Sequence, residues 1–269
     1  GKAALMPIHR WLPNAMVAST PVSALLHAVA VVKTGVFTIV KVVVYIFGID
    51  HLSSTGFHIY LAYIAGGTIV LSSLVAMQQD NLKARLAYST ISQLSYIVLG
   101  AALANAHGIL GAGLHIAMHA FGKITLFFCA GAIMVALHKT EISDMRGIGR
   151  QMPFTMAAFI IGSLSIIGVP PLGGSWSKWY LALGAADTGH LLLVGVLMLS
   201  SLLNIAYLLP IPARAFFSKA TGDDGHHGEG IHEAPLFCLI PLCLTALGCL
   251  LLFFFTDPIY QLLAPIVQP

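Results

Sequence analysis

Residues 114–123 read Leu-His-Ile-Ala-Met-His-Ala-Phe-Gly-Lys, and they place two imidazoles and one ammonium in a strongly apolar stretch. His115, His119 and Lys123 follow one another at intervals of four residues. On an α-helix a step of four turns about 40° past a full circle, so the three side chains are predicted to share one stripe. An ionisable residue in hydrocarbon costs about 2.5–3.5 kcal/mol on insertion scales. Two explanations are open: a polar seam satisfied by neighbouring helices, or a relay for protons or ions.

The composition indicates a membrane protein. Hydrophobic residues make up 58% of the chain, charged residues 9%, and the mean hydropathy is +0.89. A soluble domain carries roughly 25% charged residues, so too few polar side chains remain here to cover a surface in water. The net charge of +3 is too small to argue for a nucleic-acid partner.

The start of the chain and the spacing of its cysteines give two further expectations. The chain begins at Gly1 rather than Met, and we expect it to be the C-terminal half of a longer protein. The four cysteines have no CxxC spacing and are interpreted as small core residues. They are Cys129, Cys238, Cys243 and Cys249.

Long apolar runs predict an all-α, polytopic membrane protein with about seven transmembrane helices. The runs cover residues 21–47, 58–77, 82–104, 108–137, 153–183, 189–216 and 235–256. Each is near or above the roughly 20 residues that a membrane-spanning helix needs. Residues 50–57 are expected to form a loop between the first two.

The fifth run is interrupted near residues 168–174, and Lys178 follows the interruption. Proline removes a backbone donor and glycine permits non-helical geometry. At membrane depth, unwound backbone is tolerated only inside protein or beside water, and broken helices with nearby charge point to a transport site. The residues predicted to break the helix are Pro170, Pro171, Gly173 and Gly174.

The distribution of basic residues predicts the orientation. If the loops alternate sides, one side receives nine of the thirteen Lys and Arg residues, and the other receives none. Basic residues mark cytoplasmic loops, so the first side is assigned to the cytoplasm. The nine are Lys2, Arg10, Lys83, Arg85, Lys139, Arg146, Arg150, Arg214 and Lys219.

The other four basic residues, Lys33, Lys41, Lys123 and Lys178, fall inside the predicted helices. Lys41 lies near a helix end and can reach the interface, but Lys33 and Lys123 lie near midpoints. Burial disfavours the charged form of an amine, so such lysines can accept and release protons. Every Asp and Glu lies in a loop or at a helix end, so no acidic partner within the chain is expected for them. The alternative is structural pairing with carboxylates outside this sequence.

No cofactor or metal site is predicted. His115 and His119 have zinc-ligand spacing, but no Glu follows the first histidine as in HExxH. The stretch 226–232, which is rich in His and Gly, is interpreted as a hydrated loop rather than a metal site. No pattern for a nicotinamide, flavin or iron–sulfur cluster is present, so redox chemistry would belong to partners.

Several motifs together resemble the proton-translocating, antiporter-like membrane subunits of Mrp-type cation/proton antiporters and of respiratory complex I. Trp11-Leu-Pro-Asn-Ala-Met16 is followed by Thr20-Pro-Val-Ser-Ala-Leu-Leu-His27 and by Leu86-Ala-Tyr-Ser-Thr-Ile-Ser-Gln93. The stripe at 115–123 and the broken helix with Ser177-Lys178 complete the match. Lys33 in Val-Val-Lys-Thr-Gly, and the Gly-Gly-Ser-Trp-Ser-Lys-Trp form of the break, are most similar to the D-type proteins of Mrp antiporters.

This resemblance implies inverted five-helix repeats, each with a discontinuous helix. Residues 1–19 would end an upstream broken helix and run along the surface, and 20–216 would form the antiporter-like domain. Within it, 58–216 would be one complete repeat. A hydrophilic cytoplasmic loop at 217–234 and a last helix with its tail at 235–269 would follow.

The resemblance also implies roles for single residues. Lys2 matches the central lysine of the earlier broken helix, Lys123 matches the lysine of the second repeat, and Lys178 matches the residue near the outer exit. His27 is similar to a histidine that bridges the two halves. The family's membrane glutamate would lie upstream of this sequence.

These expectations combine into one leading function, a proton-conducting subunit of a multisubunit Na⁺/proton antiporter in the inner (plasma) membrane. Its expected partners are other membrane subunits and the lipid bilayer, and its relay residues are Lys123, His119, His115, Lys178, Lys33, His27 and Lys2. The alternatives are a proton-pumping L-, M- or N-type subunit of NADH-quinone oxidoreductase or a related membrane hydrogenase, and a structural subunit whose polar seam docks partners. In none of them is the chain catalytic by itself.

Overall fold

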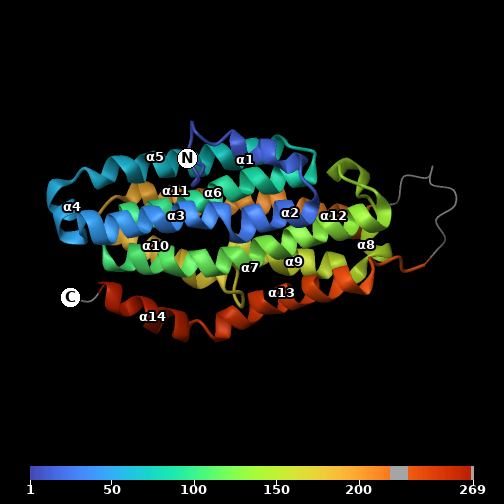
Figure 1. Cartoon of the computed structure of the whole chain (residues 1–269). Helices are drawn as coiled ribbons and strands as arrows, with labels where there is room; N and C mark the ends of the chain where they lie inside the picture. Colours follow the sequence, from blue (N-terminus) through green and yellow to red (C-terminus); the bar gives the residue numbers. More distant parts are fainter. Residues whose placement is uncertain (219–229, 268–269) are drawn as a thin grey trace.

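The apolar runs are helical in the part of the chain that the structure describes, residues 1–218 and 230–267 of a computed structural model. These helices lie alongside one another in one elongated bundle (Figure 1). The predicted all-α class is confirmed. The long elements are α5 (His58–Gln78), α6 (Leu82–Ala102), α7 (Ala106–Leu137), α9 (Pro153–Ile167), α10 (Gly174–Asp187), α11 (Leu191–Leu208), α12 (Pro210–Phe217), α13 (Leu236–Phe254) and α14 (Asp257–Val267).

The first apolar run is helical but irregular. It consists of α2 (Thr20–Ala24), the π-helix η2 (Leu25–Val29), α3 (Val31–Lys41) and the π-helix η3 (Val42–Phe47). It is preceded by α1 (Trp11–Asn14) and the 3₁₀ turn η1 (Ala15–Val17). The loop expected at 50–57 is wrong, because α4 (Ile49–Thr55) occupies most of it and bends 82° away from the preceding helix. Gly48 has φ +80°, a left-handed value open to glycine, and it supplies that bend.

Contacts between loops define two ends of the bundle. At one end, Asn81 Nδ2 donates to Glu141 Oε1 at 2.9 Å, which joins the start of α6 to the loop with η4 (Ile142–Asp144) and α8 (Ile148–Gln151). At the other end, His107 Nδ1 lies 2.5 Å from Asp187 Oδ2. The sequence analysis assigned the loops around Asn81 and Glu141 to one side of the membrane and those around His107 and Asp187 to the other. Each pair of loops lies together in the structure. The assignment of the first end to the cytoplasm stays a prediction.

The number of seven transmembrane helices is not confirmed. By length and apolarity, four helices of the described chain qualify on their own, namely α5, α7, α11 with α12, and α13, and a fifth qualifies if the bent pair at α4 counts as one. The remaining runs do not qualify for physical reasons: hydroxyl and amide side chains such as Ser89, Ser92 and Gln93 lower the apolarity of α6, and α9 and α10 have only 15 and 14 residues.

The predicted helix break lies where the sequence places it. Helix α9 ends at Ile167, and Gly168 has φ +90°. Pro170, Pro171 and Gly173 lie in the connection, and α10 begins at Gly174. A Cβ on Gly174 would lie 1.9 Å from the Ser165 carbonyl oxygen, so only glycine lets α10 start against α9.

Two apolar clusters fill the bundle, one toward each end. The first includes Leu82, Ile133 and Ala215, and the second includes Leu99 and Leu193. Buried polar side chains of α6, α7 and α11 add to this core, and they form the candidate site. The predicted hydrophilic loop at 217–234, including its His-rich part, lies mostly outside the described residues, and the domain boundaries stay predictions.

Candidate functional site

The stripe on α7 is buried. His115 is 2% exposed, His119 is 1% exposed and Lys123 is fully buried. The two imidazole centroids lie 5.9 Å apart, as expected for residues one turn apart on one face. The four-residue spacing therefore places all three groups together in the interior, as predicted.

A fourth group joins them from another helix. Lys33 on α3 is 8% exposed, and its Nζ lies 2.7 Å from Nδ1 of His119. At this distance the two bases share one proton in a hydrogen bond, with the donor set by the protonation of each. The sequence marked Lys33 as a relay residue but gave no means to pair it with His119.

Three side chains contact the imidazole ring of His115. Its Nδ1 lies 2.9 Å from Ser177 Oγ, and its Nε2 lies 3.1 Å from Gln93 Oε1. The ring stacks on Tyr96, with 5.5 Å between centroids and 21° between planes. Ser177 also donates to the Gly174 carbonyl at 3.0 Å, so the start of α10 orients this histidine.

Lys178 is bound to the broken helix. Its Nζ donates to the carbonyl of Ile167 at 2.9 Å and to Ser201 Oγ at 3.1 Å. The Ile167 carbonyl is at the end of α9, where a helix leaves carbonyls without intrahelical partners. The amine also lies 5.0 Å from the centroid of the Tyr96 ring. A cavity of about 900 Å³ adjoins Lys178, with Val169, Trp176 and Trp179 among its walls.

Lys123 bonds to α6. Its Nζ donates to Ser89 Oγ at 2.6 Å and to the Leu86 carbonyl at 3.2 Å. Within the described residues, neither Lys33, Lys123 nor Lys178 forms an ion pair, in agreement with the absence of carboxylates from the apolar runs. We call Lys33, His119, His115, Lys123 and Lys178 the central row.

A polar branch on α11 was missed by the sequence analysis. Ser89 Oγ lies 2.8 Å from the Tyr207 hydroxyl, which in turn donates to the Asn204 side-chain oxygen. Tyr207 and Asn204 are fully buried. A signal was present: polar residues recur at the helical intervals of four and three on two helices. They are Ser89, Gln93 and Tyr96 on α6, and Ser200, Asn204 and Tyr207 on α11.

Of the two remaining predicted relay residues, Lys2 is not part of this row, and His27 cannot be compared with it. The side chain of His27 lies outside the described part of the chain. Lys2 is exposed, and its backbone crosses α3 at Gly35, where an added Cβ would lie 2.7 Å from Lys2 Cβ. The N-terminus therefore lies midway along the bundle (Figure 1). Lys41 is also exposed, with its amine 5.7 Å from the Phe37 ring centroid.

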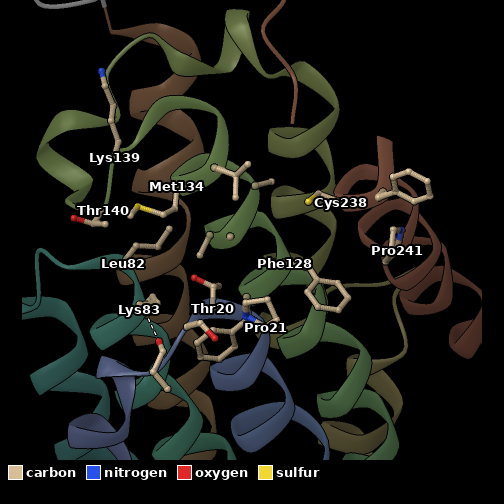
Figure 2. A pocket seen from close by; sticks show the side chains of 18 of the residues that line it. Thr20, Pro21, Leu82, Lys83, Phe128, Met134, Lys139, Thr140, Cys238 and Pro241 are labelled. Carbon is tan, nitrogen blue, oxygen red and sulfur yellow. Dashed lines mark hydrogen bonds between the residues drawn. The ribbon is translucent and has the colours of Figure 1, made fainter. Parts of the chain in front are cut away.

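A second cavity, of about 580 Å³, lies away from the row. Figure 2 shows it between the start of α2, the C-terminal part of α7 and α13, with Thr20, Phe128 and Cys238 on its walls. None of the central row residues lines it. Lys83, at its edge, donates to the Ala18 carbonyl at 3.0 Å. Among the described residues no group of three His, Cys, Asp or Glu side chains could hold a metal ion.

Comparison with known proteins gives a consistent result. Residues 1–204 match the family model described as NADH:quinone oxidoreductase/Mrp antiporter, transmembrane. The chain is 34% identical to NADH-quinone oxidoreductase subunit N of Desulforudis audaxviator, over 99% of this chain and 54% of the relative. It is 35% identical to subunit L of Mycobacterium tuberculosis, over 92% of this chain and 38% of the relative. The chain thus spans about half the length, or less, of these relatives.

Solved structures share the fold. The Mrp complex from Dietzia sp. contains a chain that matches with TM-score 0.86 and 22% identity, over 99% of this chain and 56% of that one. An archaeal membrane-bound sulfane sulfur reductase matches with TM-score 0.83 and 27% identity, over 93% and 42%. Complex I from Thermus thermophilus matches with TM-score 0.80 and 22% identity, over 100% and 56%.

Proposed function

Because the chain belongs to the NADH:quinone oxidoreductase/Mrp antiporter transmembrane family, we propose that it conducts protons across the membrane as one subunit of a larger complex. The observation that carries the proposal is the contact between Lys33 and His119 at 2.7 Å. Two bases on different helices are buried together with no carboxylate among their described neighbours. Burying ionisable groups within a membrane costs free energy, and such groups commonly mark ion or proton pathways. A buried group of this kind is therefore a candidate functional site.

The row offers a path with two distinguishable ends. Protons reach Lys33 and His119 from the end of the bundle that carries Asn81 and Glu141, which we assign to the cytoplasm. On the way they pass Lys123, which lies one turn from His119 on the cytoplasmic side of α7; they continue through His115, and leave through Lys178, whose amine adjoins the larger cavity. The path permits movement in either direction.

The host complex has two candidates. The sequence around Lys33 and the Gly-Gly-Ser-Trp-Ser-Lys-Trp form of the break resemble Mrp-type proteins, which favours a cation/proton antiporter. The relatives at 34–35% identity are named subunits of NADH-quinone oxidoreductases, which favours a redox-driven pump. In both hosts the proposed role of this chain is the same, and its partners are other membrane subunits.

The proposed relay is tested by replacing Lys123 with Ala in the complete complex, reconstituted in vesicles. A potassium diffusion potential drives protons, and an internal pH-sensitive dye reports the flux. We expect Lys123→Ala to reduce flux at least about a hundredfold, the lower range for loss of a proton-transfer group, while assembly persists. Lys123→Met, of similar shape, should reduce flux equally.

Two outcomes contradict the proposal. Unchanged flux in both variants would exclude Lys123 from the relay. Failed assembly of Lys123→Ala, rescued by Lys123→Met with normal flux, would instead indicate a structural seam. The host is distinguished separately: an antiporter exchanges internal Na⁺ for protons without a redox substrate, whereas a redox pump requires the electron donor.

A further inference from the structure

The connection between His115 and Lys178 differs from the other steps of the central row. His115 stacks on the Tyr96 ring, and the Lys178 amine lies 5.0 Å from the centroid of the same ring. The face of an aromatic ring attracts a cation but has no proton to give and no lone pair. A proton therefore needs a route around Tyr96 to reach Lys178.

Such a route begins at Lys123. Its ammonium donates to Ser89, and Tyr207 donates its own proton to Asn204. The Ser89 hydroxyl therefore donates to the Tyr207 oxygen, 2.8 Å away. Lys123, Ser89 and Tyr207 thus form a chain of donors that all point in one direction, from the amine toward α11.

The route ends at Lys178, whose amine donates to Ser201 Oγ on the same helix α11 at 3.1 Å. The Tyr96 hydroxyl donates to the Leu197 carbonyl at 3.4 Å and lies near the hydroxyls of Ser200 and Ser201. Because Ser89 meets Tyr207 and Tyr96 meets Leu197, α6 and α11 run antiparallel. Gln93 is therefore level with the turn of α11 between Ser200 and Asn204.

Three polar atoms on this level lack partners. Among the described residues, Gln93 Nε2, Asn204 Nδ2 and Ser200 Oγ are buried without a hydrogen bond. Turning either amide over exchanges its unpaired nitrogen for an unpaired oxygen, so each orientation leaves one atom unsatisfied. Buried polar groups without protein partners are generally satisfied by internal water, which makes two to four hydrogen bonds. Three such groups on two facing helices are sufficient to bind an internal water molecule.

We propose that a second proton branch, resting on the proposed proton-conducting function, links Lys123 to Lys178 along α11 and bypasses the histidines. The protonated Lys123 amine gives a proton to Ser89, Ser89 passes its own proton to Tyr207, and the Tyr207 hydroxyl turns from Asn204 to pass its proton to internal water. Water and the serine hydroxyls of α11 deliver a proton to the neutral Lys178 amine, and the hydroxyls then turn back to their starting orientation. The Asn204 amide exchanges no proton and serves to position water. The side chains of the branch are Ser89, Tyr207, Asn204, Ser200 and Ser201, with internal water between the last four.

The branch is tested with Tyr207→Phe, which removes one hydroxyl and keeps the ring, in the complete complex in vesicles. It is measured alone and together with His115→Leu, which interrupts the histidine line. Tyr63→Phe is the matched control, because Tyr63 is exposed and its hydroxyl bonds to His190, away from the row. We expect Tyr207→Phe to lower flux about twofold, as for loss of one of two parallel paths. His115→Leu should retain measurable flux, and the double variant should lose it.

Two results would overturn the branch: complete loss of flux in His115→Leu alone, or no effect of Tyr207→Phe in either background. If Lys123→Ala abolishes flux while Tyr207→Phe is neutral throughout, the relay stands and the branch fails. If Lys123→Ala is also neutral, the proposed function fails. A structure of the complex that resolves ordered water gives an independent measurement. Ordered water is expected within hydrogen-bond distance of Gln93 and Asn204. The absence of water between these two side chains would contradict the proposal.

Discussion

Helix α7 and the broken pair α9–α10 each carry one lysine of the central row, fully buried Lys123 and half-buried Lys178, but they supply its amine with different partners. Lys123 on the unbroken α7 depends on a neighbouring helix, through Ser89 and the Leu86 carbonyl of α6. Lys178 bonds to the carbonyl of Ile167, at the end of α9 itself. A continuous helix satisfies its own interior carbonyls, whereas a broken one frees them. The break thus provides a local acceptor for an amine that has no carboxylate partner among the described residues.

The largest effect is expected from closing the break. Gly174→Ala places a Cβ 1.9 Å from the Ser165 carbonyl oxygen, a backbone atom that cannot move aside cheaply. We expect a loss of about 3 kcal/mol in the free energy of unfolding, the upper range for overpacking. Thermal unfolding of the purified complex measures it. Gly195→Ala on α11 has open space around the new Cβ and should leave the complex as stable or more so. Equal unfolding temperatures in both variants would contradict the described packing of α10 on α9.

The next effect concerns the amine at the break. Lys178→Met keeps an unbranched side chain, one atom shorter, but loses the donor to Ile167 and Ser201. Proton flux should fall at least about tenfold, which corresponds to about 1.4 kcal/mol in the barrier, with assembly preserved. The vesicle assay with the pH-sensitive dye is the measurement. Normal flux would show that the lysine of the broken helix is dispensable and that α7 suffices.

A smaller effect is expected from the side chain that orients His115. Gln93→Leu removes the partner of His115 Nε2 and also one of the groups proposed to hold water in the branch, so flux should fall roughly fivefold, the equivalent of one hydrogen bond of about 1 kcal/mol. Ser95→Ala is the control on the same helix, because the Ser95 hydroxyl bonds only to the Ile91 carbonyl among the described contacts. Equal flux in the two variants would mean that the orientation of His115 does not limit transfer.

The smallest effect is expected at the exposed lysine of the first run. Lys41 lies over the rings of Phe37 and Tyr45, at 5.7 Å and 6.0 Å from their centroids, and outside the central row. Lys41→Met should keep flux within about twofold of the unmodified complex, since an exposed cation–π contact contributes about 0.5–1 kcal/mol to stability. A loss as large as that of Lys178→Met would show that charge anywhere in these helices matters, rather than charge at the break.

The sequence could predict features that depend on one helix at a time. The stripe of His115, His119 and Lys123 follows from helical periodicity, and the break follows from its prolines and glycines. The contact between Lys33 and His119 could not be predicted, because it depends on how α3 is rotated against α7. The helix α4 was taken for a loop because its residues Ile49–Thr55 are mixed in character and follow a glycine.

The branch on α11 was overlooked for a related reason. Ser200, Asn204 and Tyr207 are neutral and lie in an apolar run, so they carry no charge to attract attention. Their proposed role depends on the packing of α6 against α11, which brings Ser89 to Tyr207 and Gln93 to the same level as Asn204. A search of each apolar run for polar residues at intervals of four and three would have found both stripes before the structure was known.

The Tyr96 ring has a consequence for leakage. It is fully buried, it contacts both His115 and the Lys178 amine, and its hydroxyl is bonded to the Leu197 carbonyl of α11. The face of this ring offers neither a proton donor nor a lone pair, so it interrupts direct proton transfer between His115 and Lys178 but transmits an electric field. A charge that arrives on one side can thus change the energy of a charge on the other without any matter crossing. Tight coupling of an ion gradient to work requires this combination.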